Sequence, residues 1–169
     1  MHHEQVRALL LGGILLVACG GDQTESRPAT LEPVEIADQE GAVCGMLVRD
    51  QSAPRGQVIH RNGERAFLCS IGDLLAYLYA PSPHGQPLQV LVEVMDPSED
   101  PNLVHSGPHP WIPAEVGVYV VGISRTQIMG PPVLVYRDRA SAEKVVAGTS
   151  AQVLSYSELA DWWQGHMEH

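Results

Sequence analysis

The stretch RGQVIHRNGERAFLCSIGDLLAYLYA, residues 55–80, decides most of the fold. Short runs with the residue types of strands lie on both sides of Asn62-Gly63, and this dipeptide between two such runs is the strongest short signal of a β-hairpin. Ser70 then stands three positions before Asp73, a variant of the capping box that begins a helix. The stretch therefore predicts two antiparallel strands followed directly by a helix.

The residues beyond this stretch extend it to a unit of strand, strand, helix and strand. Pro81 and Pro83 end the helix, and residues 88–95 (LQVLVEVM) have the composition of a strand. The same order of elements then recurs in the second half of the chain. Its predicted parts are a strand at 115–123, a strand at 132–136, a helix at 139–147 and a strand at 152–156.

These elements predict an α+β fold of two pseudo-repeated ββαβ units with antiparallel sheet. We place the folded domain at residues 42–169, with units at about 42–96 and 111–156 and a short amphipathic helix at 157–165. The length of 169 residues fits one domain, or two small subdomains that share a core.

The first residues carry the pattern of a bacterial lipoprotein signal peptide. Arg7 precedes an apolar run, residues 8–18, which is too short to span a bilayer and has the length of a signal-peptide core. The run ends in LVACG, which resembles the lipobox, in which the cysteine thiol is acylated before cleavage. We therefore expect a signal peptide at residues 1–18 and lipid attachment at Cys19. The alternative is an ordinary signal peptide with an incidental cysteine.

The residues that follow Cys19 predict where the protein is held and how. An aspartate after the lipidated cysteine usually signals retention in the inner membrane, so Gly20 favours the outer membrane, on its periplasmic side. Residues 19–41 are acidic, with Arg27 as the single basic residue and no hydrophobic period, which predicts a disordered, solvated tether. The formal net charge of −10 repels phosphate backbones, so we expect no nucleic acid partner.

The most specific chemistry lies in Cys44-Gly45-Met46, which places a thiol and a thioether two residues apart. In an extended segment residues i and i+2 point to the same side, and Gly45 lets the backbone bend so that both sulfurs approach one small ion. Soft donors of this kind select Cu(I) over zinc, calcium or magnesium. Met129, in the connection between two strands of the second unit, is a third soft donor for the same ion if the two units pack together.

These sulfur-containing residues also have an explanation without a metal. Met129 would then fill a gap in the core, as methionines commonly do. Cys44 and Cys69 would form a structural disulfide, which is usual for a cysteine pair in an oxidising compartment. That pairing leads to the alternative function, a metal-free lipoprotein that serves as an interaction module.

The remaining candidate groups are histidines and possible catalytic motifs. His60, on the first hairpin, is a candidate exchangeable copper donor, and the alternative is an exposed strand residue. His84, His105 and His109 lie in proline-rich loops, where we expect them to be solvated. The chain has no G-x-S-x-G, P-loop or H-E-x-x-H motif, and Cys44 has no clearly placed partner for nucleophilic catalysis. We therefore expect a protein that is not an enzyme.

Five segments of the chain resemble, in order, the NosL family of accessory lipoproteins of nitrous oxide reductase. The resemblance covers roughly residues 42–157. It is specific because the five segments occur in the family's order behind a lipobox. The segments are CGM at 44–46, FLCSIGDLLAYL at 67–78, WIPA at 111–114, YVV at 119–121 with Met129-Gly130, and the Ala142-Glu143 helix followed by QVL at 152–154.

The resemblance implies a Cu(I) carrier on the periplasmic face of a membrane that supplies copper for the catalytic centre of nitrous oxide reductase. The implied partner is therefore that enzyme or its maturation transporter. Two ββαβ units similar to part of organomercurial lyase are also implied, although activity does not transfer with a fold. The cysteine and methionine most associated with copper in the family map onto Cys44 and Met46, and the methionine of the Met-Gly loop maps onto Met129.

Two positions depart from the family pattern. Many members carry a second cysteine or another residue just before Cys-Gly-Met, where this chain has Gly41-Ala42-Val43. The expected ligands are therefore one thiolate and thioethers. Cys69 stands where relatives often have aspartate or another small polar residue, which keeps the disulfide alternative open.

Overall fold

The computed structural model describes residues 30–126, 128 and 130–167. The predicted signal peptide, the lipid-attachment residue Cys19 and the candidate ligand Met129 lie outside these residues. Within the described part, no helix combines the length and the apolar composition that a membrane span requires.

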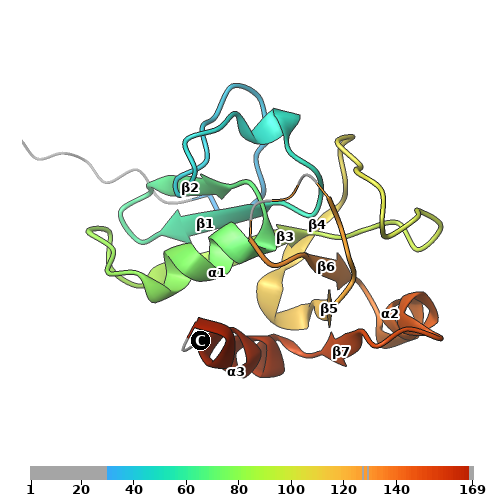
Figure 1. The fold of residues 1–169 in the computed structure, drawn as a ribbon. Coiled ribbons are helices and arrows are strands. Elements are labelled where there is room, and N and C mark those ends of the chain that lie inside the picture. The colour runs from blue at the N-terminus through green and yellow to red at the C-terminus, as the bar shows by residue number, and fades with distance from the viewer. Residues whose placement is uncertain (1–29, 127, 129, 168–169) are drawn as a thin grey trace, which may run out of the picture.

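The first unit forms a four-stranded antiparallel sheet in the order β2-β1-β3-β4 (Figure 1). Its elements are β1 (Gly56–His60), β2 (Arg65–Leu68), α1 (Ile71–Tyr79), β3 (Pro87–Glu93) and β4 (Trp111–Pro113), with short 3-10 turns at Val48–Asp50 and Ala114–Val116. This arrangement confirms the hairpin and the helix of residues 55–80. The sequence places residues from 111 onward in the second unit, but residues 111–113 form a strand that pairs with β3 of the first sheet, because tertiary contacts extend that sheet.

The second unit forms a smaller antiparallel sheet in the order β6-β5-β7. Its elements are β5 (Val118–Val121), β6 (Val133–Tyr136), α2 (Arg139–Val146) and β7 (Gln152–Leu154), and α3 (Tyr156–Met167) closes the chain. The predicted α+β fold with two ββαβ units is therefore confirmed. The terminal helix is longer than the predicted 157–165, since its first residue is Tyr156.

Local hydrogen bonds explain where the two unit helices begin. The Asp73 amide donates to the Ser70 hydroxyl at 3.0 Å, and the Ser141 amide donates to the Asp138 carboxylate at 2.8 Å. Each of these bonds satisfies a backbone N–H group that has no partner inside the helix. The cap at Ser70 is therefore as predicted, and Asp138 caps the second helix in the same way.

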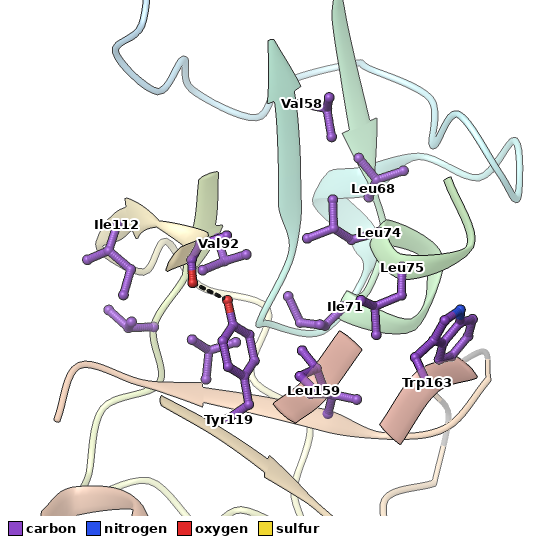
Figure 2. Packing of buried hydrophobic residues seen from close by; sticks show 14 of the residues in the cluster. Val58, Leu68, Ile71, Leu74, Leu75, Val92, Ile112, Tyr119, Leu159 and Trp163 are labelled. Carbon is purple, nitrogen blue, oxygen red and sulfur yellow. Dashed lines mark hydrogen bonds between the residues drawn. The ribbon is translucent and has the colours of Figure 1, made fainter. Parts of the chain in front are cut away.

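The two units share one hydrophobic core, and α3 packs into it. Figure 2 shows Leu159 and Trp163 of α3 beside Leu75 of α1, and all three side chains are buried. Tyr119 of β5 reaches across the same core, where its hydroxyl donates to the Ala114 carbonyl at 2.6 Å. Because its polar end is satisfied, this large side chain can be almost fully buried at little cost.

A buried ion pair holds the edge of this core together. Arg55 is 3% exposed and Glu93 is 1% exposed, and two parallel hydrogen bonds of 2.6 and 2.7 Å join their side chains. The guanidinium also donates to the Gly107 carbonyl at 3.0 Å. The pair therefore fastens the loop before β4 to the ends of β1 and β3.

Residues 30–41, expected as the last part of the tether, lie against the first hairpin. The Val34 amide donates to the Gln57 side chain at 3.1 Å, and that side chain donates back to the Val34 carbonyl at 2.7 Å. The Arg65 guanidinium donates to the Thr30 carbonyl at 2.9 Å. The packed part of the chain therefore begins before residue 42, because polar side chains of the hairpin bind the segment.

Candidate metal centre

Cys44 lies in a short loop that is fastened to the edge of the first sheet. The Gly41 amide donates to the Met46 carbonyl at 2.8 Å, which closes the loop on itself. The Ala42 amide donates to the carbonyl of Phe67 in β2, also at 2.8 Å. These two bonds hold Cys44 beside the end of β2.

Cys69 follows β2 directly and meets Cys44 there. The two sulfur atoms are 2.9 Å apart, with the Cys44 thiol donating to the sulfur of Cys69, and both cysteines are free. Cys44 is partly exposed, whereas Cys69 is only 4% exposed. The chain thus brings together two thiols that are distant in the sequence, one at the surface and one behind it.

Asp73 adds a carboxylate to this pair from the first turn of α1. The donor atoms of Cys44, Cys69 and Asp73 all lie within 4.8 Å of one another, and no other group of three among the described residues does so. The Asp73 side chain is 8% exposed, and its Oδ2 atom is buried without a hydrogen-bond partner. A buried acceptor without a partner is unfavourable unless a cation or a proton reaches it.

Gly41 forms the wall of this site. A Cβ atom added at Gly41 would lie 2.5 Å from the Cys69 sulfur and 2.7 Å from the Cys44 sulfur. Both distances are far below van der Waals contact, so any other residue at this position would push the sulfurs aside. The missing side chain is what allows both thiols to approach the backbone of the loop.

Burial controls the protonation of the cluster. It raises the pKa of the Cys69 thiol well above its ordinary value, and the neighbouring Cys44 acts in the same direction. Burial also raises the pKa of Asp73, an effect that the neighbouring Cys44 thiol and the Cys69 backbone partly offset. The Cys69 thiol therefore keeps its proton at neutral pH unless a metal ion takes the proton's place.

The structure describes two of the three ligands expected from the sequence. Cys44 is a member of the cluster, and Met129 lies outside the described residues. The segment around Gly45 is a turn rather than an extended strand, because Gly45 has a φ of +69°. The main-chain carbonyl of Met46 faces the Cys69 thiol at 3.8 Å. The i, i+2 argument that paired Met46 with Cys44 therefore started from a wrong backbone conformation.

Two members of the cluster were not expected as ligands. The sequence marks Cys69 as a disulfide candidate and Asp73 as the acidic residue of the capping-box pattern that starts at Ser70. Their spacing of i and i+4 across the start of a helix is the signal that places them on one face, next to whatever packs there. That Cys44 packs there depends on the pairing of its loop with β2, which no local pattern reveals.

His60 lies away from the thiols. β1 and β2 pair Gly56 with Leu68, so Cys69 and His60 are at opposite ends of the hairpin. His60 is 1% exposed, which excludes the exposed strand residue considered above, and its Nε2 atom is hydrogen-bonded to the Tyr77 hydroxyl at 2.9 Å. Burial lowers the pKa of His60. The described cluster is therefore built without imidazole.

Comparison with known proteins gives consistent matches. The model of the NosL family matches residues 33–163. The copper-binding lipoprotein NosL of Stutzerimonas stutzeri is 29% identical over 147 residues, which cover 85% of this chain and 73% of that protein. The protein of the same name from Achromobacter cycloclastes is 27% identical over 150 residues, which cover 87% and 75%.

A solved structure matches as well. The crystal structure of the copper chaperone NosL from Shewanella denitrificans has a TM-score of 0.64 to this chain, with 25% sequence identity. The match covers 76% of this chain and 96% of that one.

Proposed function

The chain belongs to the NosL family, and we propose that it is a lipid-anchored carrier of Cu(I) on the periplasmic side of a membrane. In this proposal it is not an enzyme: it delivers copper for assembly of the catalytic centre of nitrous oxide reductase. Two relatives named copper-binding lipoproteins and one named copper chaperone support the metal and the role. Lipid attachment at Cys19, and an acidic tether after it, would hold the carrier at the outer membrane.

The contact between the Cys44 and Cys69 thiols is the observation that carries the proposal. Thiolates are the ligands that a soft ion such as Cu(I) prefers. When Cu(I) binds both sulfurs, two S–H bonds break, two protons leave, and the complex keeps one negative charge. The sulfurs have to move apart to admit the ion, and the missing side chain of Gly41 leaves room on one side of them.

We take Cys44, Met46 and Met129 as ligands from the sequence and add Cys69 from its contact with Cys44. The unequal burial of the two thiols suggests how the copper ion would be released. Cys44 is partly exposed, so a ligand of the receiving protein reaches the ion from that side, while the buried Cys69 holds it until the exchange is complete. The receiving protein is nitrous oxide reductase or the transporter of its maturation machinery.

Titration of Cu(I) against a competing chromophoric chelator tests the copper site. We expect Cys44→Ala to lower the affinity more than 100-fold, because it removes an anionic ligand, and Met46→Leu and Met129→Leu to lower it about 10- to 100-fold. Val43→Ala is the matched control, because Val43 is 47% exposed beside Cys44. Equal affinity of wild type and Cys44→Ala would overturn the proposal. Transfer from the loaded carrier to copper-free nitrous oxide reductase then tests delivery.

The closeness of the two sulfurs also favours a second candidate, the metal-free interaction module with a Cys44–Cys69 disulfide. Counting reactive thiols in the purified protein without reductant separates the two. The carrier requires that both thiols react. If neither reacts in protein as isolated from the periplasm, the disulfide module is the better account.

A further inference from the structure

A second group of metal-ligating side chains lies in the long loop between β3 and β4, where Glu99 stands between two histidines. The His109 Nε2 atom is 3.1 Å from each oxygen of the Glu99 carboxylate. The His105 Nδ1 atom is 3.5 Å from one of these oxygens. The side chains are 6% exposed for His109, 20% for His105 and 25% for Glu99. They are thus largely removed from solvent, unlike the solvated histidines that the sequence predicts.

All the polar neighbours of these two rings are oxygen acceptors. The other nitrogen of His105, Nε2, is 2.9 Å from the Asp100 carbonyl, and the other nitrogen of His109, Nδ1, is 2.8 Å from the Gly107 carbonyl. A carbonyl only accepts hydrogen bonds, so each of these two nitrogens carries a hydrogen. The other nitrogen of each ring faces the Glu99 carboxylate, and this arrangement needs a cation, either a proton or a metal ion, between the nitrogen and the carboxylate.

Two kinds of cation can satisfy this arrangement, a proton on each ring or one metal ion. Protons would give each ring a separate ion pair with Glu99, whereas one metal ion would be shared by all three side chains. Metal-binding histidines usually donate their second ring nitrogen to a backbone carbonyl or a carboxylate, as both rings do here.

We propose that Glu99, His105 and His109 bind a divalent transition-metal ion such as Zn²⁺ or Cu²⁺. Imidazole and carboxylate donors suit these ions, whereas the thiol cluster suits the softer Cu(I). The carboxylates of Asp96 and Asp100 on the same loop add negative charge. The guanidinium groups of Arg125 and Arg55 fasten the loop by donating to the Leu103 and Gly107 carbonyls, and they bring positive charge close to it. This site does not depend on the proposed copper function.

The ion has to draw the two rings together. The donor atoms of Glu99, His105 and His109 are not all within 4.8 Å of one another, as those of the Cys44 cluster are. An irregular loop between two strands permits this movement. Binding should therefore restrict the loop, which gives a measurement separate from affinity.

The test uses the protein with Cys44→Ser and Cys69→Ser, so that the thiol cluster takes up no Zn²⁺. Calorimetric titration with Zn²⁺ at about pH 8 should show one ion bound. Glu99→Gln and His109→Gln should each weaken binding at least 10-fold. His84→Gln, a histidine substitution in another loop, is the control and should bind as the parent does. Zn²⁺ should also slow amide hydrogen exchange around His105 in the parent but not in Glu99→Gln.

Two results would overturn the site. One is a parent protein that binds no Zn²⁺, including the case in which the loop is stabilised by acid alone and the gap is filled by protons. The other is Glu99→Gln binding Zn²⁺ as tightly as the parent. Weaker Zn²⁺ binding by Glu99→Gln would not result from unfolding of this variant. The metal-free Glu99→Gln protein should keep its fold, because the side-chain amide of glutamine can still hydrogen-bond a ring nitrogen, and circular dichroism checks this.

Discussion

At the scale of single residues, Gly41 is the most constrained position of the thiol cluster. Gly41→Ala adds a Cβ atom at 2.5 and 2.7 Å from the two sulfurs, so the thiols must separate or the loop must shift. We expect the Cu(I) affinity to fall at least 10-fold, because displaced ligands cannot meet one ion. The fold should remain, since Gly41 does not have a positive φ. Competition titration measures the affinity, and circular dichroism checks the fold.

Gly165→Ala is the matched control for this change. Gly165 lies in α3, nothing is within 4 Å of an added Cβ atom, and alanine has the higher helix propensity. This variant should bind copper like wild type and be slightly more stable. If Gly41→Ala also bound copper like wild type, the ion would lie away from the two sulfurs.

Also at this scale, the Cys69 thiol should make the stability of the copper-free protein depend on alkaline pH. Its pKa is raised by burial, so the folded state binds the proton more tightly than the unfolded state. The stabilisation is complete below the unfolded pKa of about 8.5 and is lost as the pH rises above it, by up to about 1.4 kcal/mol per pH unit. Urea unfolding between about pH 7 and 10 measures this slope. Cys69→Ser should have a shallower slope, and an equal slope would contradict the assignment.

At the scale of elements, the parts that the sequence predicts are those built from neighbouring residues. The turn at Asn62-Gly63 and the cap at Ser70 each depend on contacts within a few positions, so their residue types suffice. β4 is a three-residue strand, and its pairing with β3 comes from packing across a long loop. No residue pattern of that length indicates a strand.

In the candidate site, too, the residues that local patterns predict differ from those that long-range contacts bring in. Cys44 was predicted from the residue types of a three-residue motif. The presence of Cys69 beside it depends on the Ala42 amide bonding to Phe67, a contact between distant segments. Asp73 is predicted correctly as a helix position, but its place in the capping-box pattern explains the residue locally and gives no reason to expect it next to the thiols. The part of the site that the sequence does not predict is therefore the part that depends on pairing between distant segments.

At the scale of the whole molecule, the two units should unfold together, because α3 and the shared core join them. Trp163 is 5% exposed in that core, so Trp163→Ala should cost about 3–5 kcal/mol in the free energy of unfolding. Trp162→Ala, the neighbouring half-buried residue, should cost less. Urea unfolding followed by circular dichroism and by thiol reactivity should give one coincident transition for each protein. Two separate transitions would show that the units fold independently.

The segment from residue 30 to 41 joins two parts of the proposed function. Through Val34 and Gly41 it runs along the hairpin and ends as the wall of the thiol cluster, so in a lipid-anchored carrier the tether and the wall of the metal site would be one piece of chain. Detached from the hairpin, these residues would lengthen the tether by up to about 40 Å. Bound to it, they would keep the metal site close to the membrane surface. In the proposed carrier, the hydrogen bonds from Gln57 and Arg65 to carbonyl groups of the segment would therefore set the distance from the membrane at which a partner protein can receive copper.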